Sequence, residues 1–171
     1  ITRGNLYYHF KAKEDILDDM IESMSRQLIK KATDIFNQKG IPVLQRLTMM
    51  MALNVDGNLG QEVMEQVHKP QNALLHQKMQ DGLLVGINPL ITSLIEEGMA
   101  QGICHTDYPA EVAEMTLLYS NTVVDALVQH SETERQQKVA AFIYNLERLL
   151  GMERGSMQAA ILPIFQNGQK E

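Results

Sequence analysis

The sequence has no tryptophan, a single cysteine, and only four phenylalanines and five tyrosines among its 171 residues. One cysteine, Cys104, excludes an internal disulfide and suits a reducing cytosol. We find no unbroken run of about eighteen apolar residues and no signal-peptide pattern, so we expect no membrane-spanning helix. Positive charge is also scarce, since 15 Lys and Arg face 21 Asp and Glu and leave a net charge of −6. Contact with nucleic acid would therefore need a local basic patch.

Apolar residues make up 44% of the chain, which is ample for the core of one domain. They recur in steps of three and four nearly throughout, and no alternating strand pattern occurs, so the sequence predicts an all-α fold. Pro89 predicts a kink or a break within its helix, and Gly102 predicts a helix end. The expected helices cover residues 13–36, 42–55, 61–68, 71–101, 110–130, 134–150 and, more weakly, 153–166.

The opening stretch TRGNLYYHF gathers aromatic and polar residues that can contact DNA. On a short helix, Leu6 and Phe10 share one face and anchor it, while the other side chains surround its exposed side. Hydroxyl, imidazole and guanidinium groups bond phosphate oxygens, and an asparagine can read an adenine edge. The alternative is a packed aromatic cluster with no ligand. The candidate DNA-binding residues are Thr2, Arg3, Gly4, Asn5, Tyr7, Tyr8, His9 and Lys13.

Lys13 strengthens the DNA-binding interpretation because it falls in the first turn of the following helix. A cation there opposes the helix dipole, whereas a phosphate would be bound by backbone N–H groups and by Lys13 together. The chain also begins with Ile1 rather than methionine, from which we expect further residues upstream.

The stretch TRGNLYYHFKAKEDIL resembles the recognition helix and following helix start of the TetR family of bacterial transcriptional regulators, especially its multidrug-responsive branch. The family pattern there is a basic residue, glycine, an apolar residue, tyrosine, histidine or tyrosine, phenylalanine, lysine and an apolar residue at fixed spacing. The matching residues are Arg3, Gly4, Leu6, Tyr7, His9, Phe10, Lys13 and Ile16 or Leu17.

The resemblance implies a TetR-like helical bundle with a C-terminal four-helix dimer interface and a truncated N-terminal helix-turn-helix. Residues 1–12 would be the recognition-helix remnant, 13–36 the linker helix, and 37–171 the ligand-binding and dimerisation domain. The helices that buttress the recognition helix would lie upstream of Ile1. Operator binding is therefore expected of the full-length protein only.

The two predicted helices at 110–130 and 134–150 carry apolar residues around nearly their whole circumference. Such helices must be buried on more than one side, against their own domain and against a second copy of the chain. The alternative is a thick core within one chain. The candidate homodimer interface comprises Val123, Leu127, Phe142, Leu146 and Leu149.

Methionine is concentrated on the middle helices, where flexible thioethers could line a pocket for differently shaped apolar ligands. Ordinary core packing is the alternative. A bound effector would bias the dimer between two spacings of its recognition helices, only one of which fits successive major grooves. The candidate ligand-binding residues are Met50, Asn54, Met64, His68, Met79, Leu83, Met115 and Tyr119.

We interpret the chain as a cytoplasmic, ligand-responsive transcriptional regulator, a repressor by the habit of the family. Its expected partners are operator DNA, a small-molecule effector and a second copy, with no membrane. The alternative is a helical dimerisation or lipid-binding module without DNA binding. Glu65 and His68 have a di-iron spacing but lack a second copy of the motif, and Cys104, His105 and Asp107 lie in one loop. We therefore expect no metal, no cofactor and no enzyme activity.

Overall fold

The computed structural model describes residues 13–53, 67, 69–127 and 131–160, and these form helices and connecting turns without a strand. The all-α prediction is therefore confirmed. Residues 156–160 are helical within the predicted C-terminal helix, while most of the predicted helix 61–68 lies outside the described residues. The elements are α2 (Lys13–Asn37), α3 (Val43–Ala52), the short 3-10 helix η1 (Pro70–Asn72), α5 (Ala73–Ala100), α6 (Pro109–Leu127) and α7 (Glu132–Leu149).

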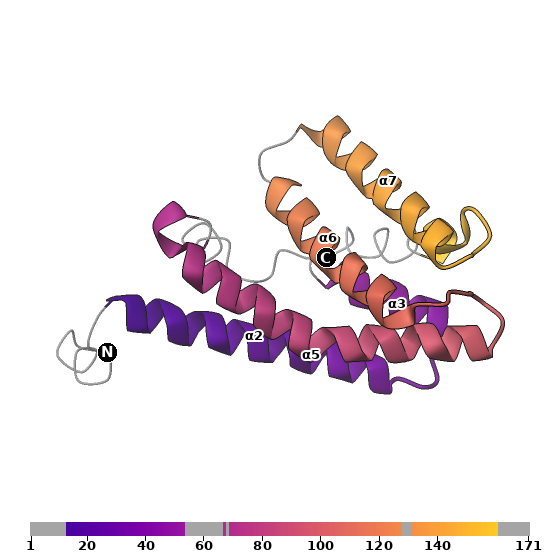
Figure 1. The fold of residues 1–171 in the computed structure, drawn as a ribbon, viewed down its shortest axis with the longest axis horizontal. Coiled ribbons are helices and arrows are strands. Elements are labelled where there is room, and N and C mark those ends of the chain that lie inside the picture. Colours follow the sequence, from indigo (N-terminus) through magenta and orange to yellow (C-terminus); the bar gives the residue numbers. More distant parts are fainter. Residues whose placement is uncertain (1–12, 54–66, 68, 128–130, 161–171) are drawn as a thin grey trace, which may run out of the picture.

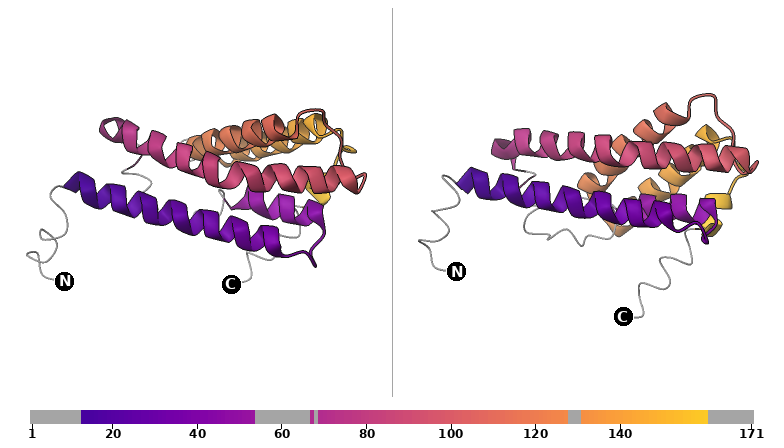
Figure 2. Two further views of the ribbon diagram at one scale, coloured as in Figure 1. Left: turned by 60° about the horizontal axis from the view of Figure 1, so that its bottom comes forward. Right: turned by 90° about the horizontal axis from the view of Figure 1, so that it is seen from below.

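Helix α5 is the centre of the arrangement, because it packs against α2 and α3 and also against α6. Figure 1 shows α2 and α5 side by side and running in the same direction, with α6 and α7 on the other side of α5. The two views of Figure 2 show the same long contact between α2 and α5. Helices α6 and α7 run in opposite directions.

The core forms where the apolar stripes of these helices meet, as the three- and four-residue spacing predicts. Each helix contributes residues that are almost wholly removed from solvent. They include Ile21, Leu28 and Ala32 of α2, Leu47 and Met50 of α3, Leu83, Ile87, Ile91 and Leu94 of α5, Val112 and Leu117 of α6, and Leu146 of α7.

Helix α5 continues through Pro89, so the predicted break is wrong. Pro89 cannot donate a hydrogen bond to the carbonyl of Val85, but both residues lie on the exposed side, where water can take the place of the lost bond. Figure 1 shows the axis of α5 changing direction along its length, which agrees with the predicted kink. The helix ends as predicted, with Gly102 at a φ of 70° and its N–H bonded to the carbonyl of Met99.

By length and composition alone, residues 70–100 form one helix that could cross a membrane. Our search for an unbroken apolar run did not find it, because polar residues interrupt the sequence. Seven residues of α5 are buried in the core. A core helix of a soluble protein can have the same length and apolar composition as a membrane span. The finding is weak evidence for a span.

The guanidinium of Arg46 joins the ends of three helices. Arg46 is on α3 and is only 1% exposed. Its Nη1 donates to the carbonyl of Phe36 at the end of α2 (3.1 Å), and its Nε donates to the carbonyl of Ile41 in the turn before α3 (3.0 Å). Its Nη2 pairs with the carboxylate of Glu97 on α5. The end of α2 is thus fixed to both α3 and α5.

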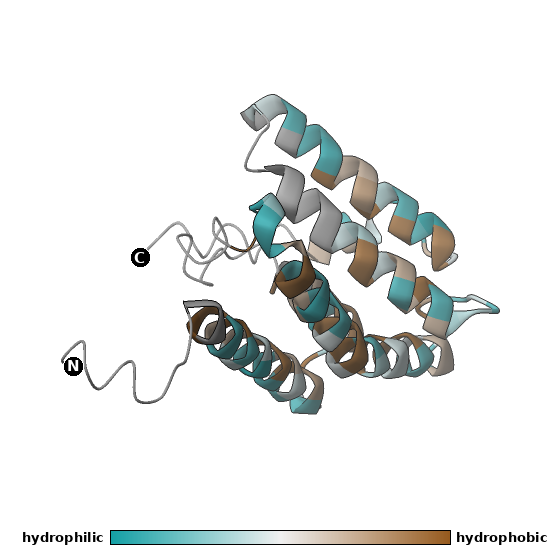
Figure 3. Ribbon diagram, turned by 60° about the vertical axis from the view of Figure 1, so that its left-hand side comes forward, coloured by the Kyte–Doolittle hydropathy of each residue, from teal (hydrophilic) through white to brown (hydrophobic). Residues whose placement is uncertain are grey.

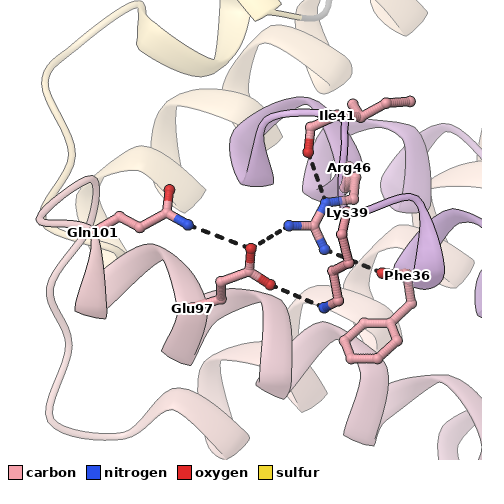
Figure 4. A network of polar contacts seen from close by, with 6 residues as sticks. All are labelled: Phe36, Lys39, Ile41, Arg46, Glu97 and Gln101. Carbon is pink, nitrogen blue, oxygen red and sulfur yellow. Dashed lines mark hydrogen bonds and ion pairs between the residues drawn. The ribbon is translucent and has the colours of Figure 1, made fainter.

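Glu97 collects two further donors at the same place, as Figure 4 shows. Its carboxylate accepts from Nζ of Lys39 at 3.2 Å and from Nε2 of Gln101 at 3.3 Å. Lys39 in turn lies over the ring of Phe36, 4.1 Å from its centroid. The hydrogen bond from Arg46 holds the pKa of Glu97 below its ordinary value of 4.5. The network therefore favours a charged Glu97.

Helix α7 is fixed at both ends by side chains. The hydroxyl of Ser131 and the side chain of Glu134 form a reciprocal capping box at its start. Near its end, the buried carboxylate of Glu147 accepts from the N–H groups of Gly155 (2.8 Å) and Met157 (2.9 Å). The bonds to Glu147 hold the segment that follows α7 against the end of that helix.

Replacing Arg46 by methionine should lower the free energy of unfolding by about 3 kcal/mol, because the Glu97 carboxylate and two backbone carbonyls lose the buried donor that they share. Replacing Lys39, whose side chain is 57% exposed, should cost less than about 1 kcal/mol. Urea unfolding at one fixed protein concentration measures both. Equal losses for the two variants would contradict the central place of Arg46.

Glu97→Gln should be less stable than the wild type near neutral pH, and the difference should shrink in acid. Because folding lowers the pKa of Glu97, its stabilising contribution is complete above its ordinary pKa of 4.5. The contribution is lost as the pH falls through the lower folded-state pKa. The melting temperatures of the two proteins, measured from about pH 7 down to about pH 3, should therefore converge. A constant difference across this range would show that the carboxylate charge is unimportant.

Candidate functional site

Helices α6 and α7 present large apolar side chains to solvent. Met115 of α6 is 55% exposed, and Leu118, Tyr119 and Leu149 are each more than two-fifths exposed. Figure 3 shows apolar residues at intervals along both helices. Exposed apolar patches of this kind mark interaction surfaces or ligand grooves.

A groove of about 190 Å³ lies between the two helices on this face. The rings of Tyr119 and Phe142 lie across it, with their centroids 5.5 Å apart and their planes inclined by 34°. The groove is lined by Met115, Thr116, Tyr119, Phe142, Asn145, Leu146 and Leu149.

The groove has few polar groups with which to recognise a polar ligand. The hydroxyl of Thr116 is already used, since it donates to the carbonyl of Val112 at 2.6 Å. Asn145 is exposed at the edge. The groove is therefore suited to burying apolar surface.

The residues predicted for the dimer interface are distributed as follows. Phe142 and Leu149 line the groove from α7. Leu146 also lines it but is only 2% exposed, so most of its surface is buried in the core of its own chain. Val123 and Leu127 lie in the last part of α6, where the side chains are outside the described residues.

The residues predicted to bind a ligand fall in two separate places. Met50, Met79 and Leu83 are buried in the core on α3 and α5. Met115 and Tyr119 instead line the exposed groove, together with residues predicted for the dimer interface. Three more predicted residues, Asn54, Met64 and His68, lie outside the described residues.

The residues predicted to contact DNA lie almost wholly outside the described part of the chain. Residues 2–9 are not described. Lys13 is the first residue of α2, which agrees with the helix start predicted from the sequence, but its side chain is outside the description. DNA contact by these residues stays a prediction.

The sequence analysis missed one buried polar group, the side-chain oxygen of Asn88 on α5. This atom is inaccessible to solvent and has no hydrogen-bond donor. Asn88 directly precedes Pro89 within the helix. Nothing in the sequence indicates which way its amide faces.

No group of three potential metal-ligating side chains occurs in the part of the chain that the structure describes. Cys104 is buried beside the carbonyl of Ile95, and this burial raises the pKa of its thiol. The thiol is therefore not activated as a nucleophile.

Comparison with known families gives one match. Residues 54–144 match the family described as "Tetracyclin repressor-like, C-terminal domain". The match includes α5, α6 and most of α7, and so covers the helices that form the groove and the helix that carries Asn88. A comparison with curated proteins found no match. The matched segment is more than half of the chain, and the chain therefore belongs to the tetracyclin repressor-like (TetR) family of regulators.

Proposed function

We propose that the chain is a ligand-responsive transcriptional repressor that binds operator DNA as a homodimer in the cytoplasm. The observation that carries the proposal is the exposed apolar face of α6 and α7 in a chain whose matched family is tetracyclin repressor-like. The protein performs no catalysis, since its task is to bind DNA and release it.

The proposed homodimer is supported by the exposed apolar face of α6 and α7. A single chain leaves Met115, Tyr119 and Leu149 exposed, and an isologous contact with a second copy would bury them on both sides. The groove would receive apolar side chains of that copy, as in the core of a stable interface. Met115 and Tyr119 then act in dimerisation rather than in effector binding.

The dimer would carry two N-terminal segments, whose separation depends on how the two chains are arranged. Residues 2–9 would read the major groove in two successive half-sites, and Lys13 would contact a phosphate at the start of α2. Because the overall charge is −6, affinity for DNA would come from these local contacts rather than from the whole surface.

The effector would bind at the buried side-chain oxygen of Asn88. A buried acceptor without a donor costs about 1–3 kcal/mol, and an effector that carries a hydrogen-bond donor beside an apolar body would remove this cost. We propose a small apolar or amphipathic molecule with one such donor. It would favour the dimer spacing that does not fit the operator.

The dimer is tested by introducing a charge into its proposed interface. Met115→Glu combined with Leu149→Glu should weaken self-association by about 30-fold or more, which corresponds to one hot-spot contact of about 2 kcal/mol. Leu74→Glu is the matched control, because Leu74 is 82% exposed on α5. Sedimentation equilibrium measures the dissociation constants. A monomeric wild type, or equal weakening by the control, would contradict the proposed interface.

Operator binding is tested with the full-length protein and the DNA upstream of its own gene. Lys13→Ala should weaken binding and lower the slope of log affinity against log salt by about one, because one phosphate contact is lost. Lys31→Ala, at an exposed lysine further along α2, should leave the slope unchanged. Fluorescence anisotropy at several salt concentrations gives both values. Unchanged affinity in Lys13→Ala would remove the phosphate role, and a wild type that binds no DNA would favour a dimerisation module.

A further inference from the structure

Helices α2 and α5 contact one another at three levels along their shared length. Near the start of α2, both carboxylate oxygens of Asp18 accept from Lys78 at 2.8 Å. In the middle, Ile29 lies against Gly86. At the end of α2, Glu97 binds the Arg46 guanidinium that also holds the carbonyl of Phe36. Figure 1 shows the two helices in parallel along this length.

The middle contact is possible only because residue 86 is glycine. A Cβ atom built at Gly86 would lie 2.4 Å from Cδ1 and 2.7 Å from Cγ1 of Ile29, whereas ordinary contacts start at 3.4 Å. Ile29 is β-branched, so its side chain has few other rotamers within a helix. Glycine weakens a helix interior relative to alanine, and here the close approach of α2 explains its presence.

The three contacts differ in strength. The Arg46 contact is buried and made of directional hydrogen bonds, so it fixes the end of α2. The Asp18–Lys78 pair is exposed, and exposed ion pairs restrain a helix only weakly. Ile21 and Leu28 also lie in the core, but apolar contacts are non-directional and do not fix the position of a helix as buried hydrogen bonds do. A displacement of α2 at Ile29 should therefore appear toward the start of the helix, where no buried hydrogen bond of this kind fixes the described residues, rather than at its end.

The geometry of a helix gives the size of this displacement. With a rise of about 1.5 Å per residue, Ile29 lies about 10 Å from Phe36 along the helix axis, and Lys13 lies about 35 Å from Phe36. If Ile29 withdraws by about 1 Å to relieve a new contact, the start of α2 moves by about 3 Å about the fixed end. Such a shift would change where the preceding DNA-binding segment lies.

We propose that Gly86 and Ile29 are positioning residues, whose contact sets the position of the start of α2 relative to α5. The inference rests on the proposed function for its consequence. An effector that shifts α5 at Gly86 moves Ile29 of α2. Because the C-terminal end of α2 is fixed, the displacement is larger at the start of α2, next to the DNA-binding segment. The helix therefore converts a small change at the α5 surface into a change of operator affinity.

The experiment compares Gly86→Ala with Gly82→Ala in the full-length protein. Gly82 is a matched control, because a Cβ there would meet nothing within 4 Å. Spin labels on Asp19→Cys in α2 and Leu74→Cys at the start of α5 report the separation of the two helices. The native Cys104 is buried and is therefore protected from labelling. Mixing with excess unlabelled protein ensures that the measured distance lies within one protomer.

Gly86→Ala should change the distance between the labels by about 2–3 Å, in proportion to the position of Asp19 along the lever. Gly82→Ala should leave it unchanged. The double variant Gly86→Ala, Ile29→Ala should restore the wild-type distance, because it removes the side chain that the new methyl group meets. An unchanged distance in Gly86→Ala, an equal change in Gly82→Ala, or no restoration in the double variant would each overturn the inference.

Operator binding tests the consequence separately. Gly86→Ala should lower operator affinity by about tenfold, within the usual range for coupled sites, and the double variant should recover it. The label distances are measured without DNA. A missing distance change therefore overturns the inference whatever the DNA result, while a wild type that binds no operator overturns the proposed function alone.

Discussion

The buried guanidinium of Arg46 determines how α2, α3 and α5 meet. Arg46 is removed from solvent, and a buried charge is stable only when it is paired and its donors are used. Glu97 supplies the opposite charge, while the carbonyls of Phe36 and Ile41 accept from Nη1 and Nε. These partners belong to α2, to α5 and to the turn that precedes α3. The hydrogen bonds of Arg46 can therefore form only when the three helices meet in one arrangement.

The anchored end gives the two faces of the fold different roles. On one side, the C-terminal end of α2 is held to α5 through Arg46, and apolar contacts follow along the length of α2. This arrangement suits a helix that moves as a rigid body. On the other side, α6 and α7 leave an apolar groove open to solvent. The proposed function would use both properties: a surface that joins two copies, and a helix that transmits a change from the ligand-binding part to the DNA-binding segment.

Apolar spacing predicted the all-α class and most helix boundaries, because a buried helix face requires apolar residues every three or four positions, whatever the single residues between them. Local signals were less completely used. Ser131 and Glu134 form a capping box that was readable in the sequence and starts α7 two residues earlier than predicted. The roles of Arg46, Gly86 and Asn88 depend on contacts between distant segments, so their sequence neighbours could not reveal them. Met115 and Tyr119, predicted to bind a ligand, line the same groove as Phe142 and Leu149, predicted for the dimer interface. Spacing along the helices could not separate effector binding from dimerisation.

The anchoring of α2 at its C-terminal end is tested most directly by amide hydrogen exchange along that helix in the full-length protein. We expect slow exchange in the last two turns, around Ile35, and faster exchange near Asp18. Arg46→Met should remove this difference by accelerating exchange at the C-terminal end. Uniform exchange along α2 in the wild type, or an unchanged gradient in the variant, would contradict the account.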